Sequence, residues 1–422
     1  MQYSNFSMID VFLFRRQIYS KLWDVAKQAV KKVVARLRKK SYLCAKSIIM
    51  TKNTLFTLFL CFILPLALVA KGHDDEHNEK HALYCDGPYI FHDSVGLGAR
   101  IVSVTPKGEI IDYHIDTLPN DWSFKVQTED GAHRFEVGLH DIVRPEAIYP
   151  TASKTYVVSD PHGNFPCFYS ILRAGGVISE DYRWTFGDGH LVVIGDVMDR
   201  GVDVTPIYWL IYKLEAEAEA AGGRLSFLLG NHEVMVLNNK NRYTHEKYKA
   251  LTDTLHISTS VLYGPHTELG RWLATRNTMM RIGTDLFVHA GLSPDFYEMD
   301  LPIDSVNAMI RRGLFAETID ETTHFLLTTM GPIWYRGLVK ESPKYRPVSN
   351  DTLQRILERY GATRLYLGHT IFKQVTKFFG GKVICVNVNN TKAKEKKRPR
   401  AVMIADGKAV LYNDKGKTGR KL

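Results

Sequence analysis

Residues 156–233 contain one pattern three times: YVVSDPHG at 156–163, LVVIGDVMDRG at 191–201 and FLLGNHE at 227–233. Each copy begins with a short apolar run and ends with acidic, amide or histidine side chains. Short β-branched runs are typical of strands that are buried on both faces. The pattern therefore predicts three buried strands, each followed directly by residues that could bind a metal ion.

The segments between these runs indicate how the strands are connected. PCFYSILRAGGVI and TPIYWLIYKLEAEAEAAGG are helical in character, and each ends in paired glycines, which commonly terminate helices. Strand, helix, strand, helix, strand predicts two right-handed βαβ units in a parallel sheet. Because the carboxyl ends of parallel strands share one edge, we expect Asp160, Asp196 and Asn231 to converge.

Histidines extend this cluster. His162 lies two residues after Asp160, so both side chains can face the same ion. Two further apolar runs, LFVHAG and RLYLGHT, end at His289 and His369. Carboxylate, amide and imidazole ligands together suit manganese, iron or zinc better than calcium. The sequence predicts two divalent metal ions bridged by Asp196, with manganese preferred over iron or zinc.

The ordered motifs DxH, GDxxDRG, GNHE, HAG and GHT cover roughly residues 155 to 390. This set resembles the phosphoprotein phosphatase family of calcineurin-like, binuclear metallophosphoesterases. GPIWYRG at 331–337 is similar to the phosphate-binding arginine segment of the bacterial Shewanella-like branch. Helix caps would explain single carboxylates, but not the histidines or the order of the motifs. The resemblance implies a four-layer αββα catalytic domain; the alternation of strands and helices alone indicates α/β.

The resemblance also implies a role for each motif residue. It divides the metal ligands between two ions, with Asp160, His162 and Asp196 on the first, and Asp196, Asn231, His289 and His369 on the second. A water whose pKa the ions lower toward about 7 would attack phosphorus in line.

The remaining motif residues would complete the reaction. His232 would protonate the leaving oxygen, and Asp199 would hold its imidazolium. Phosphate would be bound by three side chains: Arg200, Arg336 and Asn231. The alternatives to Arg336 at the mouth of the site are His190, Arg276 and Arg281.

Two motifs depart from the patterns of related enzymes. Ser159 stands where the family usually has glycine and Pro161 separates two ligands, but neither change removes a ligand. Many metallophosphodiesterases, including nucleases, end the last motif with a second histidine, whereas this chain has Phe372. The difference favours a phosphomonoesterase over a nuclease.

The predicted function is metal-dependent hydrolysis of phosphomonoesters, on phosphoserine, phosphothreonine or phosphotyrosine of proteins and peptides, or on small phosphomonoesters. One alternative is a hydrolase of dinucleoside polyphosphates such as diadenosine tetraphosphate. An alternative of another class is a catalytically silent, membrane-tethered module that binds phosphate. The oligomeric state is left open.

Charge along the 422 residues is uneven. Residues 1–50 contain 11 Lys or Arg against two acids, and residues 391–422 contain 11 against three, although the whole chain carries only +10. The stretch between them is therefore acidic. Because the basic residues lie in the tails, the net charge does not predict a nucleic-acid substrate.

The N-terminal region resembles a targeting segment. After Met50, a charged start, the run LFTLFLCFILPLALVA and a small-residue end at Ala70 predict a signal peptide at 50–70. We expect export to the periplasm or secretion after cleavage near Ala70, and a basic extension at 1–49 that is not translated if the protein starts at Met50. The alternatives are a membrane anchor at 50–70 and association of the amphipathic stretch 9–40 with a membrane surface.

The rest of the chain divides into three parts. Residues 71–83 read as a polar linker, 84–150 as a small antiparallel β domain with hairpins, and 151–422 as the catalytic domain. The segment after GNHE is expected to be helical and to line the substrate groove, with three candidate contacts: Asn238, Arg242 and Tyr243.

Overall fold

The computed structural model describes residues 83–94, 96–119, 121–389 and 399–422, which all belong to one unit, Lys80–Leu422. The predictions for 1–49, 50–70 and the linker up to residue 82 lie outside the described residues and stay predictions. In the described part of the chain, no helix is long and apolar enough to cross a membrane.

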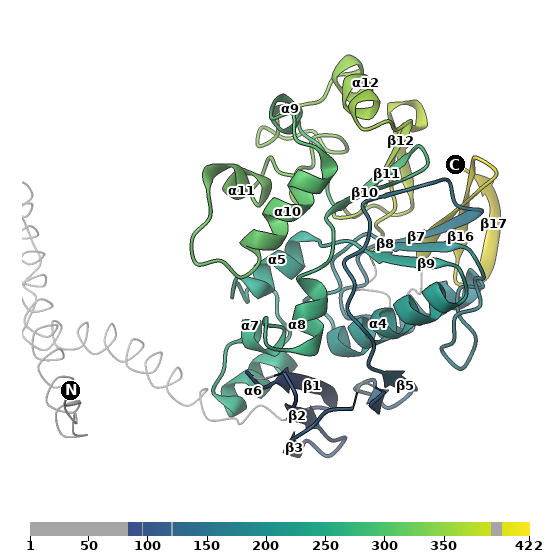
Figure 1. The fold of residues 1–422 in the computed structure, drawn as a ribbon. Coiled ribbons are helices and arrows are strands. Elements are labelled where there is room, and N and C mark those ends of the chain that lie inside the picture. Colours follow the sequence, from purple (N-terminus) through teal and green to yellow (C-terminus); the bar gives the residue numbers. More distant parts are fainter. Residues whose placement is uncertain (1–82, 95, 120, 390–398) are drawn as a thin grey trace, which may run out of the picture. The chain divides into compact units, whose positions relative to one another are not determined.

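Two six-stranded sheets form the centre of the unit (Figure 1). The first sheet has the order β17-β16-β15-β7-β8-β9, and its strands are β7 (Lys154–Val158), β8 (His190–Val193), β9 (Arg224–Phe227), β15 (Arg400–Ala405), β16 (Lys408–Asn413) and β17 (Gly416–Lys421). The second sheet has the order β13-β14-β12-β11-β10-β6, and its strands are β6 (Ile148–Tyr149), β10 (Met279–Ile282), β11 (Asp285–Val288), β12 (Arg364–Leu367), β13 (Thr376–Phe378) and β14 (Val383–Cys385).

Apolar side chains on both faces of the strands explain why the sheets pack face to face. On β8, Leu191 and Val193 belong to one apolar cluster, whereas Val192 belongs to a second cluster that also contains Phe287 and Tyr366 of the other sheet. Because successive side chains of a strand point to opposite faces, each strand contributes to the core between the sheets and to the core under the helices.

Helices cover the outer faces. In Figure 1, α10 and α12 lie on the side of the second sheet, and α4 lies on the side of the first. The helices are α3 (Phe165–Ala174), α4 (Val204–Ala220), α5 (Asn231–Leu237), α6 (Glu246–Leu255), α7 (Thr259–Leu262), α8 (Glu268–Leu273), α9 (Pro294–Glu298), α10 (Ile303–Gly313), α11 (Glu321–Leu326) and α12 (Asn350–Arg359), with the 3₁₀ turn η2 (Phe379–Gly381). The four-layer αββα fold is confirmed.

The two βαβ units are also confirmed. β7, α3, β8, α4 and β9 follow one another, and β8 pairs in parallel with β7 and β9. β11 and β12, which precede His289 and His369, pair in parallel in the second sheet. The metal ligands therefore come from both sheets.

The segment before β6 contains the expected hairpins. β2 (Ala99–Val104) pairs with β3 (Ile110–Ile115), and β4 (Ser123–Gln127) pairs with β5 (Arg134–Gly138). A further strand, β1 (Asp86–His92), pairs with β2 and was not predicted, because Pro88 argues against a strand in the sequence. β1 contacts α4 and α8, so these strands pack directly on the helices of the catalytic part.

Phe287→Ala tests the core between the sheets. Phe287 is fully buried and stacks on Tyr366 with ring centroids 5.1 Å apart. Its truncation should lower the free energy of unfolding by about 3–5 kcal/mol, because a cavity is left in a packed interior. Urea unfolding measures this, with Ile111→Ala on the exposed face of β3 as the control; equal losses in both variants would contradict the packing described.

Candidate metal centre and active site

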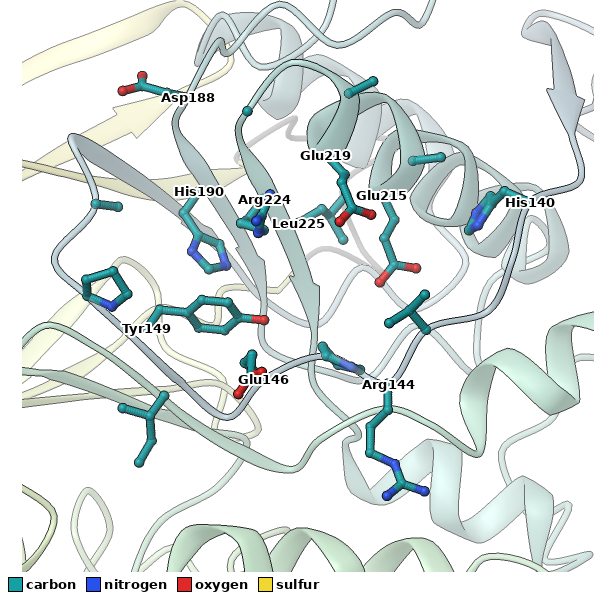
Figure 2. A pocket seen from close by; sticks show the side chains of 18 of the residues that line it. His140, Arg144, Glu146, Tyr149, Asp188, His190, Glu215, Glu219, Arg224 and Leu225 are labelled. Atoms are coloured by element: carbon teal, nitrogen blue, oxygen red, sulfur yellow. The ribbon is translucent and has the colours of Figure 1, made fainter.

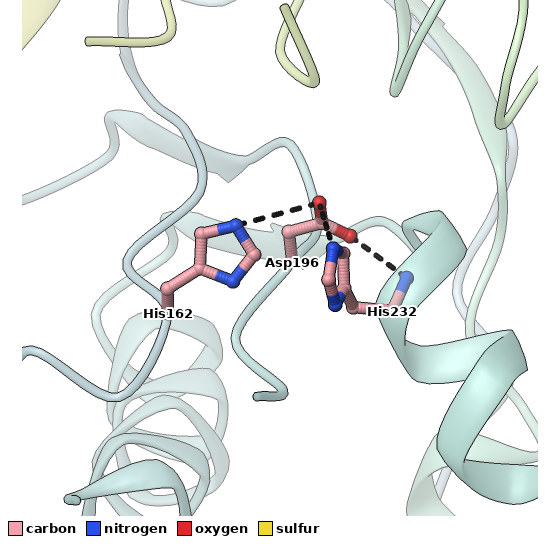
Figure 3. Close-up of side chains that lie close together, drawn as sticks. All are labelled: His162, Asp196 and His232. Carbon is pink, nitrogen blue, oxygen red and sulfur yellow. Dashed lines mark hydrogen bonds and ion pairs between the residues drawn. The ribbon is translucent and has the colours of Figure 1, made fainter. Parts of the chain in front are cut away.

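The site is built around Asp196, which follows β8 with only Ile194 and Gly195 between. Its Oδ2 lies 3.7 Å from Nε2 of His162 and 3.9 Å from Nε2 of His232 (Figure 3). The same oxygen lies 3.2 Å from Nε2 of His289. All four side chains are buried. One carboxylate therefore faces three imidazole nitrogens that come from three different segments.

A buried glutamate fixes the loop that carries Asp196. The carboxylate of Glu233 accepts hydrogen bonds from the backbone N–H groups of Asp196 at 2.9 Å, Val197 at 2.8 Å and Met198 at 3.0 Å. It also accepts from the N–H of Gly230 and from the hydroxyl of Tyr208. Glu233 belongs to the GNHE motif, but the sequence alone gave it no role; a glutamate three residues after the N-cap Gly230 commonly accepts from the N-cap N–H, and this position could have marked it.

The backbone of the ligand loops has positive φ angles, a conformation that residues other than glycine rarely adopt. Asp160, His162, Asp196 and His369 have φ between 44° and 60°. Such residues cost about 1–3 kcal/mol each and persist where their surroundings fix them. The motif glycines permit the close approach: a Cβ on Gly230 would lie 2.2 Å from Oδ1 of Asp196.

Backbone carbonyls set the orientation of two imidazoles. Nδ1 of His162 lies 2.9 Å from the carbonyl oxygen of Met198, and Nδ1 of His289 lies 2.8 Å from that of Ile194. With Nδ1–H donating to a carbonyl, Nε2 is the ring nitrogen that faces Asp196. This is the arrangement that commonly orients histidines bound to metal ions.

His369 gives a direct test of whether a metal fits. Its Nε2 is buried and has no hydrogen-bond partner among the described residues. Burial, with the neighbouring His289, holds the pKa of His369 well below its usual value, so the imidazole is neutral. A neutral imidazole whose nitrogen lacks a partner in a polar cluster is a suitable metal ligand.

Two groups of side chains could each hold an ion, and both contain Asp196. The first comprises His162, Asp196 and His232, where the sequence prediction has Asp160 in place of His232, and the second comprises Asp196, His289 and His369. In each group the candidate ligand atoms lie within 4.8 Å of one another. The described residues therefore fit two divalent ions that share Asp196.

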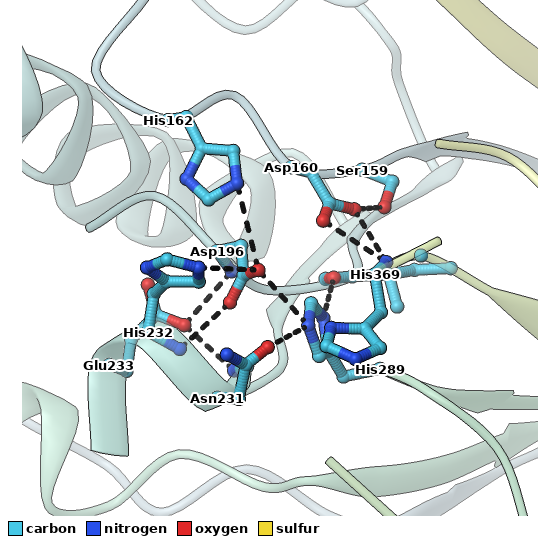
Figure 4. Close-up of polar contacts among 12 residues, drawn as sticks. Ser159, Asp160, His162, Asp196, Asn231, His232, Glu233, His289 and His369 are labelled. Carbon is cyan, nitrogen blue, oxygen red and sulfur yellow. Dashed lines mark hydrogen bonds and ion pairs between the residues drawn. The ribbon is translucent and has the colours of Figure 1, made fainter. Parts of the chain in front are cut away.

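The other two predicted ligands lie beside these groups (Figure 4). Asp160 accepts hydrogen bonds from the backbone N–H of His369 at 3.0 and 3.1 Å and from the hydroxyl of Ser159. Oδ1 of Asn231 lies 3.0 Å from Nε2 of His289. The structure thus brings all six predicted ligands together, and their division between two ions stays a prediction.

Burial and neighbouring charges shift the pKa values of the groups in this cluster. Burial raises the pKa of Asp160 to about 7 and lowers that of His162 to about 3. Burial opposes charge on His289 and Asp196 as well, but their mutual attraction outweighs it, so the pKa of His289 is raised to about 9 and that of Asp196 is held well below its usual value. Buried charges in such density require compensation, which cations would supply.

His232 has the contacts expected of a proton donor. Its Nδ1 lies 2.6 Å from Oδ2 of Asp199, and Oδ1 of Asp199 accepts from the hydroxyl of Thr244 at 2.9 Å. Burial lowers the pKa of His232, but Asp196 and Asp199 outweigh burial and raise it. Nε2 of the same ring lies 3.4 Å from a guanidinium nitrogen of Arg200.

Both predicted phosphate-binding arginines line one cavity of about 430 Å³ with these residues. The cavity is lined by His162, Asp196, Arg200, His232, Arg336, Val339, Lys340, His369, Thr370, Ile371 and Phe372. Nη1 of Arg336 lies 3.5 Å from the carbonyl oxygen of His369, and the guanidinium of Arg200 lies over the ring of Tyr243. Of the three residues expected to line the groove, Tyr243 reaches this site and Asn238 lines a different cavity.

A larger cavity, of about 950 Å³, lies at the amino-terminal ends of β8 and β9 and contains none of the predicted ligands (Figure 2). His190 lines it, with its Nε2 2.9 Å from the hydroxyl of Ser226. Arg276 is buried against Glu215, and Arg281 contacts the carbonyl of Gly283. The three alternatives to Arg336 therefore do not line the cavity of the metal ligands.

Comparison with known proteins gives concordant results. The sequence model of the calcineurin-like phosphoesterase family matches residues 153–371. An uncharacterised protein of Schizosaccharomyces pombe is 32% identical over 229 residues, which are 53% of this chain and 68% of that protein. Shewanella-like protein phosphatase 1 of Plasmodium berghei is 27% identical over 225 residues, which are 51% of this chain and 61% of that protein.

Solved structures are similar over most of the chain. The structure of a cold-active protein tyrosine phosphatase has a TM-score of 0.71 and 28% identity, and the match covers 81% of this chain and 97% of that one. A cold-active protein tyrosine phosphatase from a psychrophilic Shewanella species has a TM-score of 0.70 and 28% identity, with 80% and 98% covered.

Glu233→Gln tests the support of the Asp196 loop. An amide cannot accept from all the N–H groups that the carboxylate accepts from, so buried donors lose partners and the free energy of unfolding should fall by about 2–4 kcal/mol. Urea unfolding measures this, and Glu217→Gln, which changes a carboxylate that pairs with Lys213 and Arg183, is the control. A Glu233→Gln protein as stable as the parent would show that the carboxylate is dispensable.

His190→Gln tests acid stability away from the metal ligands. Burial, with Arg224 nearby, lowers the pKa of His190 to about 3, so the unfolded chain binds the proton more tightly. The stability from neutral His190 is complete above its unfolded pKa of about 6.5 and is lost as the pH falls toward 3. Between pH 7.5 and 5.0 the parent should lose about 2 kcal/mol more than the variant in urea unfolding; parallel losses would contradict a buried neutral His190.

Proposed function

The chain belongs to the calcineurin-like phosphoesterase family, and on that premise we propose that it is a protein phosphatase that uses two manganese ions. The observation that carries the proposal is one cavity lined by three of the predicted metal ligands together with His232 and two arginines; these ligands are His162, Asp196 and His369. A metallophosphoesterase needs these three functions together: a place for cations, a proton donor and donors for the phosphate oxygens.

The metal centre would be held by Asp160, His162, Asp196, Asn231, His289 and His369. When bound, divalent ions polarise the phosphoryl group, neutralise its charge and make a water nucleophilic near neutral pH. Carboxylate, amide and imidazole ligands without thiolate support manganese and are also compatible with iron or zinc. The two groups of ligand atoms that share Asp196 support two ions over one.

Arg200 and Arg336 would orient the phosphate. A guanidinium presents parallel donors that match two oxygens of a phosphate, so two arginines in one cavity can fix a phosphomonoester against the ligand cluster. The guanidinium of Arg200 packs over the ring of Tyr243, whose centroid lies 5.3 Å from the guanidinium carbon. The guanidinium that would bind the phosphate is thus positioned by a contact within the protein, before substrate binds.

His232 would deliver the proton to the leaving oxygen. Because Nδ1–H of His232 donates to Asp199, Nε2 on the cavity side of the ring is the nitrogen that would carry the proton to the leaving oxygen. Asp199 stabilises the imidazolium and is itself fixed by Thr244. The ring is therefore held in one tautomer and one orientation.

The residues around the cavity support a phosphorylated side chain of a protein as substrate, with phosphotyrosine first. Val339, Ile371 and Phe372 give the cavity an apolar wall, and Ile371 is 45% exposed. An aryl leaving group can pack on such a wall, whereas the small side chain of phosphoserine reaches less of it. The names of the similar proteins, Shewanella-like protein phosphatases and protein tyrosine phosphatases, agree with this choice.

A substrate panel with two variants tests the proposal. Protein with manganese should hydrolyse p-nitrophenyl phosphate and phosphotyrosine peptides faster than phosphoserine peptides of the same sequence, and should hydrolyse bis(p-nitrophenyl) phosphate and diadenosine tetraphosphate poorly. His232→Asn should lower kcat by about 10²–10⁴-fold, the usual range for loss of a general acid. His324→Asn, on the exposed face of α11, is the control.

Chelation and Asp196→Asn should both abolish turnover. Preferred hydrolysis of the diester or of diadenosine tetraphosphate would contradict the substrate class. Turnover that survives metal removal would contradict the metal-dependent reaction, and a fully active His232→Asn would remove the assigned proton donor.

A further inference from the structure

The loop that carries Asp199 and Arg200 is strained. Asp199 and Arg200 are consecutive non-glycine residues with φ of 71° and 70°. Each such residue costs free energy and relaxes unless its surroundings hold it. Because Asp199 orients the proton donor and Arg200 faces the substrate cavity, contacts that hold residues 199–203 determine the geometry of the reaction.

The segment that leads into α6 supplies the first of these contacts. The carbonyl of Tyr243 accepts from the N–H of Arg200 at 3.0 Å, and Thr244 donates its hydroxyl hydrogen to Asp199. One turn further on, the hydroxyl of Tyr248 donates to the carbonyl of Val202 at 2.9 Å. Residues 243–248 therefore lie along the loop and contact it at Asp199, Arg200 and Val202.

A buried lysine completes this contact. Nζ of Lys247 donates to the carbonyl of Val202 at 2.8 Å, and the side chain of Lys247 is 1% exposed. The ammonium lies 3.3 Å from Oδ1 of Asp86 and 3.6 Å from Oε2 of Glu129. Asp86 belongs to β1 and Glu129 to the turn between β4 and β5, so both carboxylates come from the N-terminal strands.

The same strands hold the other end of the loop. The N–H of Glu129 donates to Oδ1 of Asp203 at 2.8 Å. Oδ2 of Asp86 accepts from the hydroxyl of Thr205 at 3.0 Å, at the start of α4. Residues 199–205 are thus enclosed between α6 and strands that carry no motif of the reaction.

We propose that Lys247 is a positioning residue, and that its ion pairs with buried Asp86 and half-buried Glu129 make the N-terminal strands part of the active site. The ammonium contacts the carboxylates of these strands and the Val202 carbonyl at the same time, so it fixes that carbonyl relative to the strands. Val202 lies three residues after Asp199 and two after Arg200. Removing one partner of a buried ion pair leaves the other charge uncompensated, so the loop relaxes from its strained conformation. This inference rests on the proposed function, because that function gives Asp199 and Arg200 their roles.

Lys247→Met tests the proposal. With p-nitrophenyl phosphate and manganese, kcat should fall by about 10- to 100-fold, since small displacements of catalytic groups have effects of this size. The inhibition constant for inorganic phosphate should rise several-fold, and the metal content should stay that of the parent. In hydrogen exchange, the amides of residues 199–204 should exchange faster, while those of β8 should not.

Lys213→Met is the matched control. Lys213 is also a buried lysine in an ion pair, with its side chain 9% exposed beside Glu217, but it lies on α4 away from the loop. It should lower thermal stability while kcat and the phosphate inhibition constant stay within about twofold of the parent. A folded Lys247→Met protein with parental kcat, phosphate inhibition and exchange at 199–204 would overturn the proposal.

Glu129→Gln decides the question if Lys247→Met does not fold. The Glu129 side chain is 25% exposed, so loss of its charge leaves the core intact. We expect kcat to fall about threefold to tenfold and the amides of 199–204 to exchange faster, because the ion pair is weakened rather than lost. A parental kcat together with parental exchange would overturn the proposal. If the parent itself hydrolyses no phosphate ester, the proposed function fails, and exchange at 199–204 still tests the positioning role alone.

Discussion

The contact between Asp196 and three imidazole nitrogens is the constraint on which the rest of the site depends. A buried carboxylate just after β8 requires compensation, and it receives part of it from His289 at 3.2 Å and His232 at 3.9 Å, whereas the neutral ring of His162 lies 3.7 Å away. Those rings are fixed in turn by Met198, Asp199 and Ile194. The three segments that carry these histidines are therefore positioned relative to one side chain, whose own loop is held by the buried carboxylate of Glu233.

The fold explains how such distant segments meet. β7, β8 and β9 end at one edge of the first sheet, and β11 and β12 end at the facing edge of the second, so that the two sheets supply ligands from opposite sides. The apolar cluster that contains Val192, Phe287 and Tyr366 keeps the sheets together. Packing between the sheets thus helps to set the distances between the metal ligands, because a close-packed interior passes a shift of one side chain on to its neighbours.

Much of this could be predicted from the sequence, since polar residues at the ends of short apolar runs mark a sheet edge. Asp160, Asp196, Asn231, His289 and His369 could all be placed on this basis, while the division of the ligands between two ions and the role of His232 required the resemblance to known enzymes. Glu233 was missed because its function depends on backbone N–H groups, which a sequence does not display. Strand β1 was missed because Pro88 is unfavourable in a strand, and Lys247 because a lysine in a polar helix usually faces solvent.

The number of metal ions at Asp196 tests the central claim most directly. Crystals of the manganese-loaded protein, measured by anomalous diffraction at the manganese edge, should show two peaks on either side of the Asp196 carboxylate, one near His162 and one near His289 and His369. A single peak, or peaks that do not contact Asp196, would contradict a binuclear centre bridged by this residue.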